Sequence, residues 1–166
     1  PTSARRWTDG DRLAGPATAA LVVQPVVVYA TNAVVKLRGD AWPTGRAIHT
    51  VFGLSRFTTP VGEAVAGVDP LVAAAGWGWL ALLVASPVLL VSGGRTRTAF
   101  ATALVAGHLG MLATMRLGLF PLIAVAALLP LFDTGIWNRV ETAVGRRPTP
   151  DTPPGRRRRR LQRLGR

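Results

Sequence analysis

The chain of 166 residues contains no cysteine, a single lysine and a single tyrosine. Without cysteine, neither a disulfide framework nor a thiolate metal site can form. The two histidines have no suitably spaced acidic partners, so the sequence predicts no metal site. It also shows no Ser-His-Asp constellation and no glycine-rich phosphate loop. The usual motifs of soluble hydrolases and nucleotide-binding enzymes are therefore missing.

Apolar residues make up 49% of the chain and are gathered into a few long blocks. No polar stripe at helical spacing runs the full length of these blocks, as it would in a soluble bundle. The sequence therefore predicts an all-α, polytopic transmembrane helical bundle with about four spans. We expect the spans at 17–37, 71–93, 98–116 and 117–133. The last is short and contains Pro121 and Pro130, so we expect it to be tilted or broken.

The formal net charge of +12 is concentrated in the segment 145–166, where arginines alternate with prolines. Such a segment cannot build a core, so the sequence predicts a disordered tail that adsorbs to anionic lipid head groups. No aromatic residues are interleaved with these arginines, and we expect no nucleic-acid partner. The excess of basic residues then predicts a multi-pass protein of the cell membrane whose tail and lead, 1–16, are cytoplasmic.

In this orientation the connection 38–70 lies on the extracytoplasmic side of the membrane. Segments 44–52 and 60–68 are predicted as short interfacial helices, and a plain linker with aromatic anchors is the alternative. Thr59 before Pro60 and Asp69 before Pro70 are typical of helix starts.

One polar face stands out in the first predicted span. Tyr29, Asn32 and Lys36 are three and four residues apart, so a helix would project them from one side, with Pro25 below them. Polar groups on a membrane helix are costly toward lipid and should face the bundle or a cavity. A shielded lysine can lose its proton and act as a base, which arginine cannot do. Alternatively, Lys36 is an ordinary lysine that reaches the membrane boundary.

His108 is the second candidate, since it lies within the third predicted span among small residues. A lone histidine in a membrane helix indicates either a functional site or an interhelical hydrogen bond. The sequence leaves both readings open.

The stretches "VVYATNAVVKLRGDAWPTGRAIHTVFG", "FTTPVG" and "GHLGMLATMRLGLFPLIAVAALLPLF" together resemble the horizontally transferred transmembrane domain. This membrane module is shared with vitamin K-dependent γ-carboxylases, and the chain looks most similar to halophilic archaeal members. The resemblance covers most of 21–137. It has the form of the C-terminal half of the module, so it implies either that further helices are encoded upstream or that this chain does not run the whole reaction.

The resemblance implies that Lys36 matches the lysine that deprotonates reduced vitamin K, with the register uncertain by one residue. It implies that His108 matches a histidine near the pocket, and that Tyr29, Asn32 and Trp42 contact the quinone. The implied chemistry is the carboxylation of a protein glutamate, coupled to oxidation of a reduced quinone. The sequence thus leaves two functions open: a quinone-linked carboxylase or oxidoreductase with Lys36 as base, and a non-catalytic membrane module that binds lipid, quinone or a partner helix.

Overall fold

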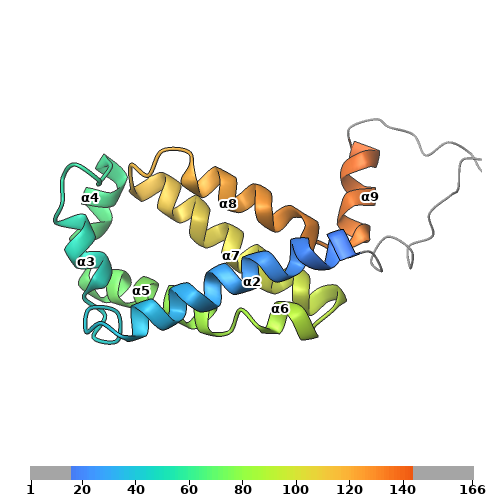
Figure 1. Cartoon of the computed structure of the whole chain (residues 1–166). Helices are drawn as coiled ribbons and strands as arrows, with labels where there is room; N and C mark the ends of the chain where they lie inside the picture. The colour runs from blue at the N-terminus through green and yellow to red at the C-terminus, as the bar shows by residue number, and fades with distance from the viewer. Residues whose placement is uncertain (1–15, 144–166) are drawn as a thin grey trace, which may run out of the picture. The chain divides into compact units, whose positions relative to one another are not determined.

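The computed structural model describes residues 16–143, and every named element in that range is a helix. The predicted all-α class is therefore confirmed for the described residues. The predicted tail 145–166 and most of the predicted lead 1–16 lie outside them. Figure 1 shows the order of the elements. They are α2 (Pro16–Leu37), α3 (Ala47–Phe52), α4 (Pro60–Ala66), α5 (Asp69–Val84), α6 (Val88–Val91), α7 (Gly94–Thr114), α8 (Phe120–Leu128), the 3₁₀ helix η1 (Leu129–Leu131) and α9 (Thr134–Ala143).

Helix α2 buries only a narrow stripe of its surface. Val26, Tyr29 and Ala33 are three and four residues apart and are each less than 8% exposed, which is the spacing of one helix face. This stripe packs against α5, α6, α8 and η1. The remaining circumference is largely apolar but exposed, as for Val27 at 55% and Val35 at 63%. Its exposed polar residues are Gln24, Thr31 and Asn32. Only part of the apolar surface of α2 is therefore buried within the chain.

The core joins α2 to the later helices. It consists of Val26, Tyr29, Ala33, Leu83, Leu89, Ala101, Leu104, Leu128 and Leu131, with Trp79, Phe100 and Phe132 packed at its edge. Helices α7 and α8 lie side by side along this core (Figure 1). Burial of these side chains supplies the main free energy that holds the helices together in water, and close packing does so in lipid.

The short helices α3 and α4 meet the C-terminal end of α7. Thr58 pairs with Met115 in an isolated antiparallel bridge. The Thr59 N–H donates to the carbonyl oxygen of Thr114 (3.1 Å) and its hydroxyl donates to that of Ala113 (2.6 Å). The same hydroxyl accepts from the Gly62 N–H (3.2 Å) and caps α4. Thr59 thus starts one helix and satisfies the last carbonyls of another.

The opposite end of α7 is fixed in a similar way. The Arg97 guanidinium donates twice to the carbonyl oxygen of Ser92, with its Nε at 2.9 Å. The Asp133 N–H donates to the hydroxyl of Thr98 (3.3 Å), so the segment after η1 returns to the start of α7. Helix α7 is therefore bound at both ends by segments that are distant in the sequence.

Several elements begin or end elsewhere than the sequence predicts. The helices expected at 44–52 and 60–68 are present as the shorter α3 and α4. Helix α7 begins at Gly94, four residues before the predicted span. Its first turn includes Arg97, whose guanidinium bonds back to the carbonyl oxygen of Ser92. The predicted span 117–133 is a helix of nine residues followed by a 3₁₀ turn at Pro130, since proline lacks the N–H that an α-helix requires.

One described helix, α2, is by itself long and apolar enough to cross a membrane, over Ala19–Leu37. Helices α4 and α5 reach that length and apolarity only together, and they meet at an angle of 107°. By length and composition the described residues thus contain one such helix, or two if the bent pair is counted. The four predicted spans stay a prediction.

Helix α9 forms a unit separate from the residues up to Asp133 and is described by itself. The predicted fourth span ends at 133, and the sequence predicts no helix beyond it. The reason is that α9 is too short and too polar to give a membrane signal.

The double role of Thr59 gives a stability prediction. The substitution Thr59→Val keeps the shape of the side chain but removes both the cap of α4 and the hydrogen bond to Ala113. We expect the free energy of unfolding to fall by about 1–2 kcal/mol, measured by thermal unfolding. The matched control is Thr102→Val, because that exposed hydroxyl bonds only to Thr98 in its own helix. An equal effect of both substitutions would contradict the proposed link between α4 and α7.

Candidate functional site

His108 is the most deeply buried ionisable side chain among the described residues, at 1% exposure. It lies in the middle of α7, where its Nδ1 is 2.8 Å from the carbonyl oxygen of Leu104, one turn earlier. Because a carbonyl only accepts hydrogen bonds, Nδ1 must carry the proton. In the neutral imidazole, Nε2 is then an acceptor. No described residue hydrogen-bonds this nitrogen.

Three aromatic rings from three other helices surround His108. The ring centroid of Trp79 in α5 is 5.0 Å away in an edge-on arrangement, and those of Tyr29 in α2 and Phe120 in α8 are each 6.0 Å away. Such tilted geometries are favourable between aromatic rings. The four helices therefore converge on one imidazole, which we call the His108 cluster: Tyr29, Trp79, His108 and Phe120.

A glycine in α7 allows Trp79 to approach. A Cβ atom on Gly107 would lie 2.4 Å from the Trp79 ring, far inside van der Waals contact. The indole therefore lies directly on the backbone of α7 and closes one side of the cluster. The sequence places small residues beside His108, but only the fold identifies Trp79 as their partner.

Tyr29 brings the second polar atom to this cluster. The residue is 7% exposed, and its hydroxyl makes no hydrogen bond to a residue in the described part of the chain. The buried side-chain atoms of the described residues that lack a hydrogen-bond partner are Ser86 Oγ and Ser92 Oγ, and this hydroxyl is not one of them. One donor and one acceptor, on Tyr29 and His108, thus belong to an otherwise apolar cluster.

Lys36 lies elsewhere on α2. It is half-buried, and its Nζ is 4.2 Å from the centroid of the Trp42 ring. Seven residues separate it from Tyr29, which is about 10 Å along a helix. The protonated amine is the form that an aromatic face attracts. Lys36 and Trp42 therefore form a separate pair near the end of α2, outside the His108 cluster.

Asn32 faces a different direction from the two other residues of the predicted polar face. It is exposed, and its amide donates to the carbonyl oxygen of Val28 in the same helix (3.2 Å). In position, Asn32 is three residues from Tyr29 and so lies about 60° around the helix from it. The structure thus brings Tyr29 together with His108, and Lys36 together with Trp42, and leaves Asn32 apart.

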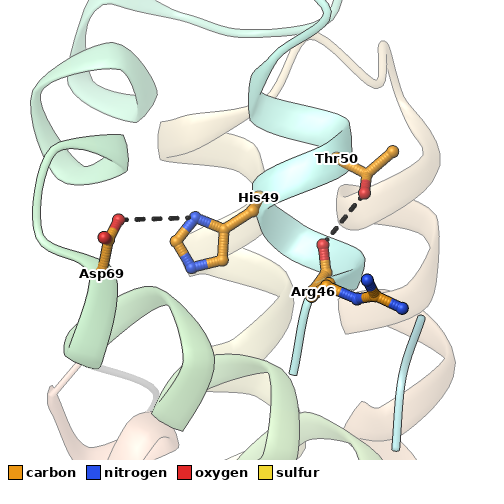
Figure 2. Close-up of polar contacts among 4 residues, drawn as sticks. All are labelled: Arg46, His49, Thr50 and Asp69. Atoms are coloured by element: carbon orange, nitrogen blue, oxygen red, sulfur yellow. Dashed lines mark hydrogen bonds and ion pairs between the residues drawn. The ribbon is translucent and has the colours of Figure 1, made fainter. Parts of the chain in front are cut away.

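A shallow depression of about 470 Å³ lies on the connection between α2 and α5. His49 and Asp69 face each other there, with Nδ1 and Oδ1 3.7 Å apart. Figure 2 shows this pair, with the Arg46 guanidinium directed away from it. The lining residues are Thr44, Gly45, Arg46, His49, Asp69, Pro70 and Ala73. The sequence gives no sign of the pair, because the two residues are twenty positions apart and meet only through the packing of α3 on α5.

The loop beside this depression is held by Trp77. Its indole Nε1 donates to the carbonyl oxygen of Pro43 (3.2 Å). Gly45 has a φ of +74°, and a Cβ there would lie 3.0 Å from the indole. Glycine is therefore required by both the backbone conformation and the space. No group of three or more metal-binding side chains occurs within residues 16–143.

Comparison of the chain with protein-family models, with curated proteins and with solved structures found no match. The resemblance to the horizontally transferred transmembrane domain therefore stays a prediction from the sequence.

The contact between Gly107 and Trp79 can be tested by substitution. Gly107→Ala forces the indole away from α7, so we expect the free energy of unfolding to fall by about 1–3 kcal/mol. Gly110→Ala is the control, because a Cβ at that position meets nothing within 4 Å. There the higher helix propensity of alanine should add up to about 1 kcal/mol. Thermal unfolding of both variants checks the prediction, which fails if Gly107→Ala is as stable as Gly110→Ala.

Proposed function

We propose that the chain is an integral, multi-pass membrane module that binds a reduced quinone at the His108 cluster. The first support is the apolar outer surface of unit 16–133. Large apolar side chains on α2, α6 and α8 are exposed, among them Val35 at 63%, Val91 at 87% and Ile123 at 66%. Exposed apolar side chains in this number are unfavourable in water and favourable in lipid.

The lengths of the helices agree with a bilayer. Helices α2 and α7 have 22 and 21 residues, which corresponds to about 33 and 31 Å, close to the thickness of a hydrocarbon core of about 30 Å. The other two segments are α5 with α6 and α8 with η1, which are broken or shorter. Of these segments only α2 is by itself also apolar enough to cross a membrane, so the number of four spans rests on the sequence.

The contacts between helix ends support an alternating topology. The bridge from Thr58 to Met115 joins the connection after α2 to the end of α7. The bond from Asp133 to Thr98 joins the end of η1 to the start of α7. Both contacts are what an up-and-down passage of the four segments requires. The excess of basic residues after α9 then favours a cytoplasmic C-terminus.

The observation that carries the ligand proposal is the fixed tautomer of buried His108. Its Nε2 can accept a hydrogen bond from a ligand, and the Tyr29 hydroxyl can donate one. A hydroquinone offers a hydroxyl group that donates and accepts, on a planar ring that suits aromatic surroundings. Trp79 and Phe120 contribute such surroundings. A membrane-soluble quinol therefore matches the chemistry of this cluster.

The geometry favours binding over catalysis by Lys36. The amine stacks on Trp42 in the way that a charged ammonium does, whereas a general base must be neutral before it takes a proton. It also lies about two helical turns from Tyr29. Carboxylation of a protein glutamate with Lys36 as base, as the family resemblance implies, is therefore the less supported of the two functions.

Binding of a short-chain naphthohydroquinone to the purified protein in detergent tests the site. Tyr29→Phe removes only the donor, so we expect about 5- to 20-fold weaker binding, the effect of one hydrogen bond. Quenching of tryptophan fluorescence measures the affinity, because Trp79 borders the site. The controls are Asn32→Ala and Lys36→Met, which should leave the affinity unchanged. Loss of affinity in Lys36→Met with none in Tyr29→Phe would move the site to Lys36 and Trp42.

Single-cysteine labelling tests the topology, because the chain has no cysteine of its own. Gly39→Cys and Gly93→Cys are suitable reporters, since an added Cβ at either position meets nothing within 4 Å. With a membrane-impermeant maleimide on intact cells, we expect labelling at position 39 and none at position 93 until the cells are permeabilised.

The same reagent tests burial in lipid. Val27→Cys and Ile123→Cys each place the cysteine at an exposed apolar position, the first in α2 and the second in α8. We expect both to stay unlabelled in intact and permeabilised membranes and to react only after detergent unfolding. Rapid labelling at both positions in permeabilised membranes would show that these faces are in water and would refute the membrane proposal.

A further inference from the structure

Helix α9 carries an apolar face that the sequence prediction did not include. Ile136, Trp137 and Val140 recur at the spacing of one side of a helix. Trp137 is 39% exposed and Val140 is 44% exposed. Exposed Arg139 lies at the edge of this face, about 60° from Ile136. A ten-residue helix with this division is amphipathic but too short to span a membrane.

The residue types of this face fit the boundary between lipid and water. Tryptophan is enriched at the head-group level, where its ring is in apolar surroundings and its N–H is in contact with polar groups. An arginine at the edge of an apolar face can extend its guanidinium to the phosphates while its methylene groups cover apolar surface. Valine and isoleucine would enter the outermost acyl region.

The charge that follows α9 determines which lipid is favoured. Residues 144–166 contain nine arginines and one acidic residue, Asp151. Basic residues next to an amphipathic helix attract anionic head groups, and the attraction grows with the number of charges. Neutral lipid offers no such complementarity. The occupant that matches both the apolar face and the adjacent charge is thus an anionic lipid surface.

We propose that α9 is an interfacial anchor, which lies in the head-group layer of an anionic membrane with Trp137 and Val140 toward the acyl chains. This inference rests on the proposed membrane function. It adds that the end of the chain binds lipid through a folded amphipathic helix, and not through its arginines alone.

The test uses the full chain in lipid nanodiscs, with an environment-sensitive fluorophore on a single cysteine. Val140→Cys reports the apolar face. Asn138→Cys is the matched control, because that position is about 160° away around the helix. In discs with phosphatidylglycerol, we expect emission from position 140 to shift to shorter wavelength, and its quenching by acrylamide to be several-fold weaker than at position 138.

Three further measurements separate the contribution of the charges from that of the apolar face. In discs of phosphatidylcholine alone, the difference between positions 140 and 138 should shrink, and deletion of 146–166 should have the same effect in anionic discs. Trp137→Ala should also reduce the difference. Equal quenching at positions 140 and 138 in anionic discs overturns the anchor.

Failure of the anchor proposal can be distinguished from failure of the proposed membrane function. If positions 27 and 123 are protected from maleimide while positions 140 and 138 are quenched equally, the protein is in the membrane and the anchor alone is refuted. If positions 27 and 123 are labelled rapidly, the membrane function is refuted. In that case the anchor, which presupposes this function, is overturned with it.

Discussion

The structure depends on an imbalance in α2, which buries one narrow stripe and exposes a remainder that is largely apolar. The stripe of Val26, Tyr29 and Ala33 holds the core together. The exposed valines of the same helix have no partner in that core and would be a liability in water. In an apolar surrounding such as the proposed lipid bilayer, the exposed valines of α2 are no longer unfavourable. The fold therefore supports the membrane proposal. In such a surrounding, polar groups must find their partners within the protein.

Several hydrogen bonds satisfy helix ends and loops within the chain. Thr59 accepts from α4 and donates to the end of α7, so that one hydroxyl serves two helix ends. Trp77 ties the loop after α2 to α5 through the carbonyl oxygen of Pro43. His108 satisfies one of its nitrogens within its own helix. The second nitrogen of His108 and the hydroxyl of Tyr29 make no hydrogen bond to a described residue, and polar groups of this kind in an apolar cluster can serve a ligand. The buried, unpartnered side-chain atoms of the described residues lie elsewhere, at Ser86 and Ser92.

The sequence predicts the helical class and the positions of most helices well, because long apolar blocks, Thr-Pro pairs and prolines act locally. It also selects Tyr29, Lys36 and His108 as residues of interest. It cannot predict their grouping, since the contact between Tyr29 and His108 depends on how α2 packs against residues eighty positions later. The spacing of Asn32 also places it on the predicted polar face. Its amide nevertheless donates to the carbonyl oxygen of Val28, and its side chain is exposed. The pair of His49 and Asp69, and helix α9, are likewise consequences of packing and of short segments that hydropathy does not detect.

The contacts that hold the two ends of α7 become available at different times during translation. Thr58 and Thr59 precede α7 in the chain, so their hydrogen-bonding groups already exist when Ala113 and Thr114 leave the ribosome. The partner of Thr98, in contrast, is Asp133, which is made later. Chains assemble from the N-terminus as they are synthesised. The C-terminal end of α7 can therefore be fixed before residues 117–133 have left the ribosome, and α8 then packs along a helix that is already held at one end.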